Sequence, residues 1–272
     1  MAGPRTLLAW STGKDSAWTL HVLRQAGDVE VVGLLTTVNA AFDRVAMHAV
    51  RRQLLEAQAE AAGLPLVIVP IPWPCPNAAY EAAFSAALTR AQQEMGITHI
   101  AFGDLFLEDV RAYRERQLEG TGLTPMFPLW GRPTRALAEE MVAGGLRAIL
   151  TCIDPRRLPA SFVGRTFDAQ LLADLPGEVD PCGEAGEFHT FAYAGPMFSA
   201  PLVPVVGEIV EREGFVFADV VCAEPSGGPE ASIFDADGAL TREFLLQRGA
   251  CCGNGCRNCP YDWEAVPKGN KG

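Results

Sequence analysis

The sequence predicts the α/β fold class, with an open parallel sheet that carries helices on both faces and a smaller α+β domain after it. Three observations lead to this prediction. Short apolar runs alternate with long helical stretches between Thr6 and Cys152. A polar turn, "STGKDS", follows directly after the first apolar run. From Ile153 onward, proline and glycine become frequent and the alternation ends.

The first elements enclose this polar turn. The apolar run Thr6–Trp10 predicts a buried strand, and Ala17–Gln25 predicts a helix that ends near Gly27. The β-rich run Val31–Thr37 predicts a second strand. A strand, a helix and another strand in this order form the unit of a parallel sheet.

The same order then repeats. Arg44–Ala62 has helical composition and stops at Gly63, and Leu66–Ile71 predicts the third strand. Asn77 can cap the helix Ala78–Met95 because its side chain accepts hydrogen bonds from free backbone N–H groups.

The last part of the alternation holds the fourth and fifth expected strands. His99–Gly103 is the fourth, and a polar helix over residues 107–120 follows it. The stretch "TPMFPLWGRPT" is rich in proline and aromatic residues, which predicts a loop near the ligand edge of the sheet. Thr134–Gly144 predicts a further helix, and Arg147–Cys152 the fifth strand.

Composition limits the function classes. The chain has 272 residues, 49% hydrophobic and 20% charged, which is typical of a soluble globular protein. The formal net charge of −11 argues against broad contact with nucleic acid, which requires many cationic groups. No apolar run is long enough for a membrane span, so we expect no membrane partner and a cytoplasmic location. Eight cysteines in such a chain are not expected to form a disulfide framework.

The polar turn from Ser11 to Ser16 predicts a pyrophosphate-binding loop. A Walker A loop is excluded because Leu8 stands where it requires glycine and Asp15 where it requires serine or threonine. Ser11 and Lys14 match a Ser-x-x-Lys pair, but its companion motifs are absent from the sequence. At the end of a strand, backbone N–H groups, hydroxyls and the positive end of the next helix can surround a polyphosphate. An ordinary helix-capping turn is the alternative.

This loop resembles the Ser-Gly-Gly-Lys-Asp-Ser signature of the N-type ATP pyrophosphatases in the adenine nucleotide alpha hydrolase superfamily, with Thr12 in place of the first glycine. The stretches "FGD" (102–104), "FPLW" (127–130) and "CGEAGEFHTF" (182–191) narrow the resemblance to the diphthine–ammonia ligase family, also described as ATP-binding domain 4 proteins. It extends from about residue 5 to about residue 222. The implied fold is the Rossmann-like one of that superfamily.

The resemblance implies a ligase that uses ATP and Mg²⁺ to adenylate a substrate carboxylate, releases pyrophosphate and forms an amide with ammonia. The carboxylate could belong to a small molecule or to a protein. We expect a nucleotide-binding domain over residues 1–152, a substrate-binding domain over 153–245 and a cysteine-rich tail over 246–272. Within the second of these, Phe215–Val221 and Ala231–Asp235 read as strands.

The expected site residues form three overlapping groups. The nucleotide group is Ser11, Thr12, Gly13, Lys14, Asp15, Ser16, Thr36 and Gly103. The catalytic group is Lys14, Asp15, Asp104, Glu184 and Glu187. The substrate group is Asn39, Arg44, His48, Glu108, Arg111, Trp130, Glu184, Glu187 and His189.

The chemistry of the residues supports several of these assignments. Asp104 follows a strand at the edge where open α/β sheets bind ligands. Glu184, Glu187 and His189 place two carboxylates and an imidazole within six positions, which can bind a cation or move a proton. A hairpin with polar residues at its rim is the alternative for this second group.

Three members of the substrate group have a structural alternative. Glu108 and Arg111 share a helix face and could equally form a solvated ion pair. His48 lies on an expected helix, where a single histidine is more often structural.

The tail carries Cys251, Cys252, Cys256 and Cys259 within nine positions. Four thiolates can bind Zn²⁺ or an iron–sulfur cluster, and the glycines between them let the chain turn back. The adjacent pair Cys251–Cys252 does not fit a regular zinc knuckle. A reduced tail without metal is the alternative.

Two other functions remain open from the sequence. One is a tRNA-modifying, thiolase-type adenylating enzyme in which Cys75 and Cys182 carry sulfur. The other is a non-catalytic ATP-binding module. A homodimer is one alternative for the assembly.

Overall fold

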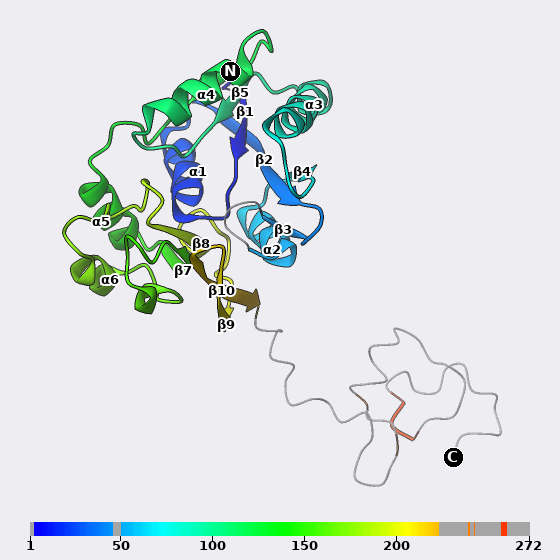
Figure 1. Ribbon diagram of the computed structural model, residues 1–272. Helices are drawn as coiled ribbons and strands as arrows, with labels where there is room; N and C mark the ends of the chain where they lie inside the picture. Colours follow the sequence, from blue (N-terminus) through cyan, green and yellow to red (C-terminus); the bar gives the residue numbers. More distant parts are fainter. Residues whose placement is uncertain (1–2, 46–49, 223–238, 240–241, 243–256, 260–272) are drawn as a thin grey trace, which may run out of the picture. The chain divides into compact units, whose positions relative to one another are not determined.

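A six-stranded sheet lies at the centre of the first part of the chain (Figure 1). The computed structural model describes residues 3–45, 50–222, 239, 242 and 257–259. Five strands run parallel in the order β4–β2–β1–β5–β6, and the short strand β3 pairs antiparallel with the end of β2. Their bounds are β1 Arg5–Ala9, β2 Glu30–Asn39, β3 Arg44–Val45, β4 Leu66–Ile71, β5 His99–Ala101 and β6 Thr124–Met126.

Helices cover both faces of this sheet. Neighbouring residues of each strand point to opposite faces, so each face has apolar side chains that the helices bury. Leu8 packs into the cluster that holds residues of α1, α2 and α5, whereas Leu7 packs into the cluster that holds residues of α3 and α4. The same division separates Leu34 from Leu35. The helices are α1 Lys14–Ala26, α2 Arg52–Ala62, α3 Asn77–Met95, α4 Glu108–Leu118 and α5 Thr134–Ala143. The expected α/β fold is therefore confirmed.

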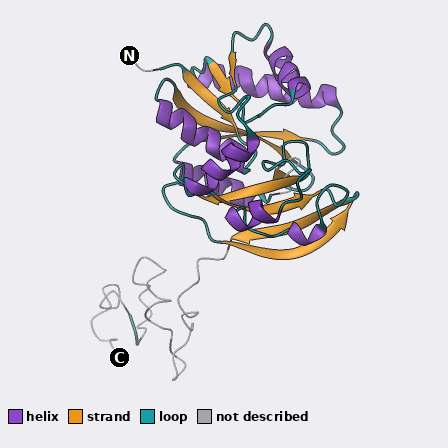
Figure 2. Ribbon diagram, turned by 90° about the vertical axis from the view of Figure 1, so that its left-hand side faces the viewer, coloured by secondary structure: helices purple, strands orange, loops and turns teal. Residues whose placement is uncertain are grey.

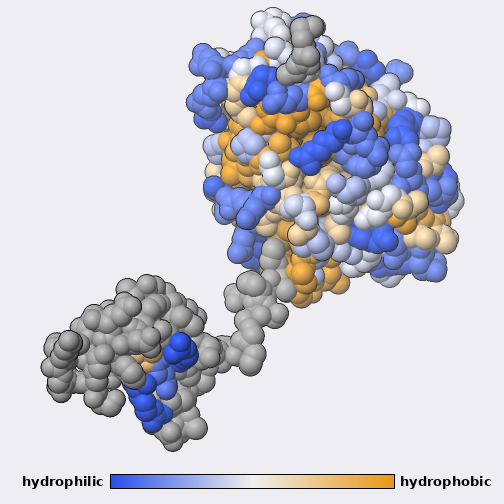
Figure 3. Space-filling model, turned by 180° about the vertical axis from the view of Figure 1, so that it is seen from behind, coloured by the Kyte–Doolittle hydropathy of each residue, from blue (hydrophilic) through white to orange (hydrophobic). Residues whose placement is uncertain are grey.

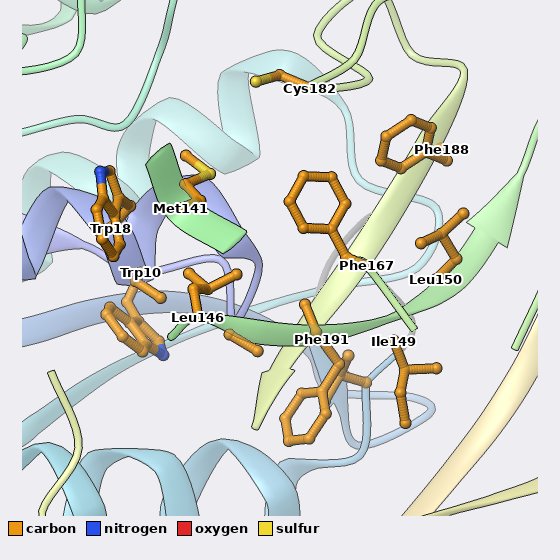
Figure 4. Packing of buried hydrophobic residues seen from close by; sticks show 14 of the residues in the cluster. Trp10, Trp18, Met141, Leu146, Ile149, Leu150, Phe167, Cys182, Phe188 and Phe191 are labelled. Carbon is orange, nitrogen blue, oxygen red and sulfur yellow. The ribbon is translucent and has the colours of Figure 1, made fainter. Parts of the chain in front are cut away.

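A second, antiparallel sheet has the strand order β8–β7–β10–β9 (Figure 2). Its strands are β7 Arg147–Ile153, β8 Phe188–Ala194, β9 Pro204–Arg212 and β10 Phe215–Cys222, with the short helices η1 Ala160–Phe162 and α6 Ala169–Asp174 beside them. Its buried side chains share one hydrophobic cluster with α1 and α5, and part of that cluster is shown in Figure 4. The two sheets are thus parts of one core.

Two expected elements differ from the structure in their pairing. The expected fifth strand, β7, pairs antiparallel with β8 and β10, and so belongs to the second sheet. The fifth parallel strand is instead β6, within the stretch that was expected as a loop. The local sequence pattern could not show which sheet contains β7, because this strand is buried almost throughout and resembles a strand of a parallel sheet.

Residues 44–62 do not form one helix. Asp43 adopts a left-handed conformation with φ 51°, and the chain turns back so that Arg44 pairs with Asn39 of β2. Helix α2 begins only at Arg52. Helix α3 includes Asn77, so Pro76 and not Asn77 occupies the N-cap position. The expected helix ends near Gly27, Gly63 and Gly96 are confirmed, because each of these glycines is a left-handed C-cap.

Strand β9 is the edge of the second sheet and exposes apolar side chains. Val205 is 47% exposed and Ile209 is 55% exposed. Figure 3 shows apolar surface on the first part of the chain near the end of β10. Within the described residues, no helix is both long and apolar enough to cross a membrane.

The chain divides into two compact units, Met1–Cys222 and Ala223–Gly272. Both sheets belong to the first unit. The expected strand Ala231–Asp235 lies outside the described residues. The domain boundaries at residues 152 and 245 stay a prediction.

Candidate functional site

The loop between β1 and α1 is folded by hydrogen bonds within the loop and from the sheets. Ser11 Oγ lies 3.2 Å from Ser16 Oγ, and Ser16 Oγ donates to the Gly13 carbonyl at 3.0 Å. Thr36 Oγ1 on β2 donates to the carbonyl of Trp10 at 2.8 Å. Thr12 has φ 71°, a left-handed conformation that a β-branched residue rarely adopts. The glycine of the resembling signature would adopt it without strain.

Lys14 begins α1 and is only 2% exposed. Its Nζ lies 2.7 Å and 2.9 Å from the two carboxylate oxygens of Asp15 and donates to the carbonyl of Cys182. It also lies 5.7 Å from the Phe167 ring centre and 5.5 Å from that of Phe188; both rings are labelled in Figure 4. Burial lowers the pKa of Lys14, but Asp15, Cys182 and Glu184 together outweigh burial, so the pKa is raised overall.

Asp15 points into the same site from the second position of the helix. Burial raises the pKa of its carboxyl, and the Lys14 ammonium only partly opposes that effect. The Asp15 carboxylate already compensates the Lys14 ammonium, so Lys14 does not fully neutralise the additional carboxylates nearby.

Asp104 is one of these carboxylates and follows the end of β5. Burial raises the pKa of Asp104, with Arg114 opposing the shift. The Arg114 Nε lies 3.7 Å from Asp104 Oδ2, and neither atom has a hydrogen-bond partner. The residue before Asp104 is Gly103, which lets the chain pass close to the start of α1. A Cβ at this position would lie 3.1 Å from the backbone of Asp15 and Ser16.

The loop before β8 supplies the acidic group from the second sheet. Glu184 Oε1 accepts a hydrogen bond from the backbone N–H of Leu105 at 2.8 Å. Burial, reinforced by Asp15 and Asp104, raises the pKa of Glu184 to about 7. Burial and then Lys14 lower the pKa of His189 to about 4, so its imidazole is neutral at pH 7.

These elements enclose a cavity of about 710 Å³. That volume lies within the range of roughly 300–1,000 Å³ typical of small-ligand sites. It is lined by nine of the residues that the sequence predicts: Ser11, Lys14, Asp15, Ser16, Thr36, Gly103, Asp104, Glu184 and His189. Thr12 and Gly13 belong to the same loop without lining the cavity. The structure therefore brings most of the nucleotide and catalytic groups to one place.

Glu187 lies behind the lining. Its side chain is 5% exposed, and Oε1 accepts a hydrogen bond from the Asp180 N–H at 3.2 Å. Its Oε2 has no hydrogen-bond partner. These contacts place Glu187 in the turn before β8, and its expected role in the site stays a prediction.

Most of the expected substrate group lies outside the cavity lining. Asn39 Oδ1 accepts from the Ala41 N–H at 3.0 Å and stabilises the turn after β2. Arg44 Nη1 forms an ion pair of 2.9 Å with Asp219 of β10. Glu108 is in the first turn of α4. His48 lies outside the described residues.

Arg111 and Trp130 contact each other. The Arg111 guanidinium lies 4.8 Å from the ring centres of both Phe127 and Trp130, and it pairs with Glu115 at 2.8 Å. The arginine thereby joins α4 to the turn after β6 through cation–π contacts.

Several cavity residues were not predicted from the sequence. They include Trp10, Tyr80, Arg114 and Thr190. Arg114 Nη1 donates to the Tyr80 hydroxyl at 3.3 Å, and its guanidinium lies 5.1 Å from the Phe102 ring centre. Arg114 is three positions after Arg111 on α4, but the spacing alone could not show which arginine lines the cavity.

The donor set suits a magnesium ion held jointly by protein and phosphate oxygens. Among the described residues, no three Asp, Glu, His or Cys side chains converge to hold a metal by themselves. Mg²⁺ commonly uses only one or two carboxylates together with phosphate oxygens and water. Asp15 and Asp104, whose Oδ2 accepts no hydrogen bond, fit that requirement.

Of the four cysteines in the tail, the structure describes only Cys259. Cys251, Cys252 and Cys256 lie outside the described residues. The backbone carbonyl of Cys259 accepts a hydrogen bond from Arg242 Nη1 at 3.5 Å.

Comparison with known proteins links both sheets to one family. The family models described as "Diphthamide synthase N-terminal domain" and "Diphthamide synthase C-terminal domain" match residues 4–125 and 133–218. Residues 238–265 match a further model, described as a family of unknown function (DUF5522).

Two curated relatives share this similarity over most of their length, and others over a smaller part. The chain is 28% identical over 230 residues to the diphthine--ammonia ligase of Danio rerio, which covers 77% of this chain and 90% of the relative. It is 25% identical over 231 residues to that of Bos taurus, with 77% and 86% covered. The Homo sapiens protein of the same name is 26% identical over 138 residues, with 49% and 52% covered.

Proposed function

Because the chain belongs to the diphthamide synthase family, we propose that it is an ATP-dependent, amide-forming ligase. It transfers the AMP part of ATP to a substrate carboxylate with release of pyrophosphate, and then joins that acyl group to ammonia with release of AMP and a proton. The observation that carries this proposal is the single cavity in which the Ser11–Ser16 loop and Asp104 of the first sheet meet Glu184 of the second.

The first-sheet side of the cavity binds the nucleotide. The Ser11 hydroxyl and the N-terminal end of α1 offer donors to phosphate oxygens. Asp15 and Asp104 would hold Mg²⁺, which would neutralise phosphate charge. The lining also contains Leu35, Val45 and Ile71, which offer apolar contact to the base.

The second-sheet side handles the amine. Glu184 exchanges its proton near neutral pH, so it can accept a proton from the attacking ammonia. His189 stays neutral and adds no positive charge that would repel ammonium. Arg114 also lines the cavity, and its guanidinium is suited to a carboxylate.

The test is to incubate the protein with ATP, Mg²⁺, ammonium and a panel of small and protein-bound carboxylates, and to measure AMP, pyrophosphate and amide. We expect AMP and amide to appear in equal amounts with one class of carboxylate. Stimulation by tRNA in place of any carboxylate would contradict the ligase. Tight ATP binding without turnover would instead favour the non-catalytic module.

The thiolase alternative is disfavoured by the site. Burial raises the pKa of Cys182 to about 12, which leaves almost no thiolate at neutral pH. The net charge of −11 also opposes tRNA binding.

The proposal also concerns the location of the protein, the metal at its C-terminal cysteines and its assembly. We place the enzyme in the cytoplasm, where ATP and ammonium are available. Elemental analysis of the purified full chain would detect Zn²⁺ or iron bound by Cys251, Cys252, Cys256 and Cys259. Light scattering after size-exclusion chromatography would decide between a monomer and the homodimer.

A further inference from the structure

Gln58 of α2 is fully buried, with 0% exposure, and uses its whole amide group. Its Oε1 accepts a hydrogen bond from the Trp10 indole Nε1 at 2.8 Å. Its Nε2 donates to the carbonyl of Thr12 at 3.0 Å and to the carbonyl of Ala192 on β8. One side chain therefore joins the start of the phosphate loop, its strained residue and the second sheet.

Only an uncharged amide satisfies these three partners at once. The indole requires an acceptor, and the two carbonyls require two N–H donors on one nitrogen. A carboxylate would face two carbonyl oxygens without a donor, and an apolar side chain would form none of the three hydrogen bonds. A buried polar group without a partner costs more than the hydrogen bond is worth.

The carbonyl of Thr12 is held from two sides. It accepts a second hydrogen bond from the Ala192 N–H at 2.9 Å. Thr12 itself is 0% exposed and its Oγ1 has no hydrogen-bond partner, so the side chain does not stabilise its own left-handed conformation. A strained backbone persists only where its surroundings maintain it. The two donors on this carbonyl are such surroundings.

We propose that Gln58 is a positioning residue of the phosphate loop: it holds Thr12 in the left-handed conformation and thereby sets the affinity for ATP. The first half of this inference concerns geometry alone, and the second rests on the proposed function. Gln58 does not line the cavity, so it acts through Thr12 and not by contact with the nucleotide.

The test is a double-mutant cycle with Gln58→Met and Thr12→Gly. Glycine adopts the left-handed conformation without strain, so the loop should need Gln58 less. In urea unfolding, we expect Gln58→Met to lower stability in both backgrounds, with a loss about half as large in the Thr12→Gly background. Equal losses in the two backgrounds would show that Gln58 does not hold Thr12 and would overturn the proposal.

Nucleotide affinity is the second readout, measured by calorimetry with Mg²⁺ and α,β-methylene-ATP, which cannot be cleaved between those phosphates. We expect Gln58→Met to weaken binding roughly tenfold alone but at most about threefold with Thr12→Gly. An unchanged affinity would make Gln58 merely structural and would overturn the second half. A wild type that binds no analogue would overturn the proposed function, while the unfolding cycle would still decide the geometry.

Gln92→Met is the matched control. Gln92 of α3 also donates to a carbonyl, that of Thr121 at 2.9 Å, but it lies away from the loop. It should show no coupling to Thr12→Gly and no effect on analogue binding. If Gln58→Met does not fold, Gln58→Asn replaces it in the same cycle, because it stays uncharged and its side chain is one methylene too short to reach all three partners.

Discussion

Lys14 Nζ donates a hydrogen bond to the backbone carbonyl of Cys182, a residue 168 positions later in the chain. The lysine of the phosphate loop thus contacts the loop that carries Glu184. Because Asp15 also compensates its charge at 2.7 Å, Lys14 stabilises the junction of the two sheets as well as facing the cavity.

Replacing Lys14 should therefore affect both folding and activity. In Lys14→Met, the Asp15 carboxylate loses its buried partner, and we expect the free energy of unfolding to fall by about 3 kcal/mol. AMP formation should fall at least about 100-fold because a cation near the phosphates is lost. Urea unfolding and an AMP assay measure the two effects.

The double variant Lys14→Met/Asp15→Asn separates these two roles. It removes the unpaired charge, so part of the lost stability should return while AMP formation stays low. If Lys14→Met alone were as stable as the wild type, the compensation by Asp15 would have no energetic weight.

Thr12→Gly should raise the free energy of unfolding by about 1 kcal/mol. The change removes the strain of a left-handed β-branched residue and an unpaired buried hydroxyl, and these gains exceed the small cavity and the extra entropy of glycine in the unfolded chain. Thermal unfolding followed by circular dichroism measures it. A lower melting temperature would show that packing of the threonine side chain is worth more than the strain.

Glu184→Gln should change the pH dependence of stability. The pKa of Glu184 is raised to about 7 in the folded protein, so the folded state holds a proton that the unfolded state releases from about pH 4.5 upward. Wild-type stability therefore falls as the pH rises from 4.5 to 7, and glutamine removes that part of the fall while still accepting from Leu105. We expect the variant to gain roughly 2 kcal/mol relative to wild type across this window, allowing for partial exposure. Two parallel stability curves between pH 4.5 and pH 8 would rule this out.

Gly103→Ala should destabilise the junction of β5 with α1. The new methyl group would lie 3.1 Å from the backbone of Asp15 and Ser16, so the helix N-terminus must shift. We expect a loss of about 1–3 kcal/mol in urea unfolding and weaker ATP binding. Gly177→Ala is the control, because nothing lies within 4 Å of a Cβ there. Equal behaviour of the two variants would refute the close approach at Gly103.

Much of the fold could be predicted from local pattern. Helix ends near Gly63 and Gly96 follow from the left-handed conformation that glycine adopts easily. Strand β6 was missed because Pro125 and its short length conceal it. Arg44 was expected in a helix because the pattern does not reveal the turn before it. That turn requires a positive φ at Asp43, which is uncommon for a residue other than glycine.

The residues of the candidate site likewise fall into two kinds, those that the local sequence reveals and those that only packing reveals. The Ser11–Ser16 loop could be recognised because its donors are neighbours in sequence. Arg114 could not be chosen over Arg111, because both are on α4 and only packing shows that one lines the cavity while the other lies between Phe127 and Trp130.

The sequence by itself determined the strand–loop–helix unit and the alternation of strands and helices, because these depend on residues a few positions apart. Tertiary structure decided which sheet receives β7, which carboxylates share the cavity with Lys14, and how Gln58 reaches both Thr12 and Ala192. These contacts join residues dozens to more than a hundred positions apart, and a partner at that distance is selected by packing of the whole core and not by local preference.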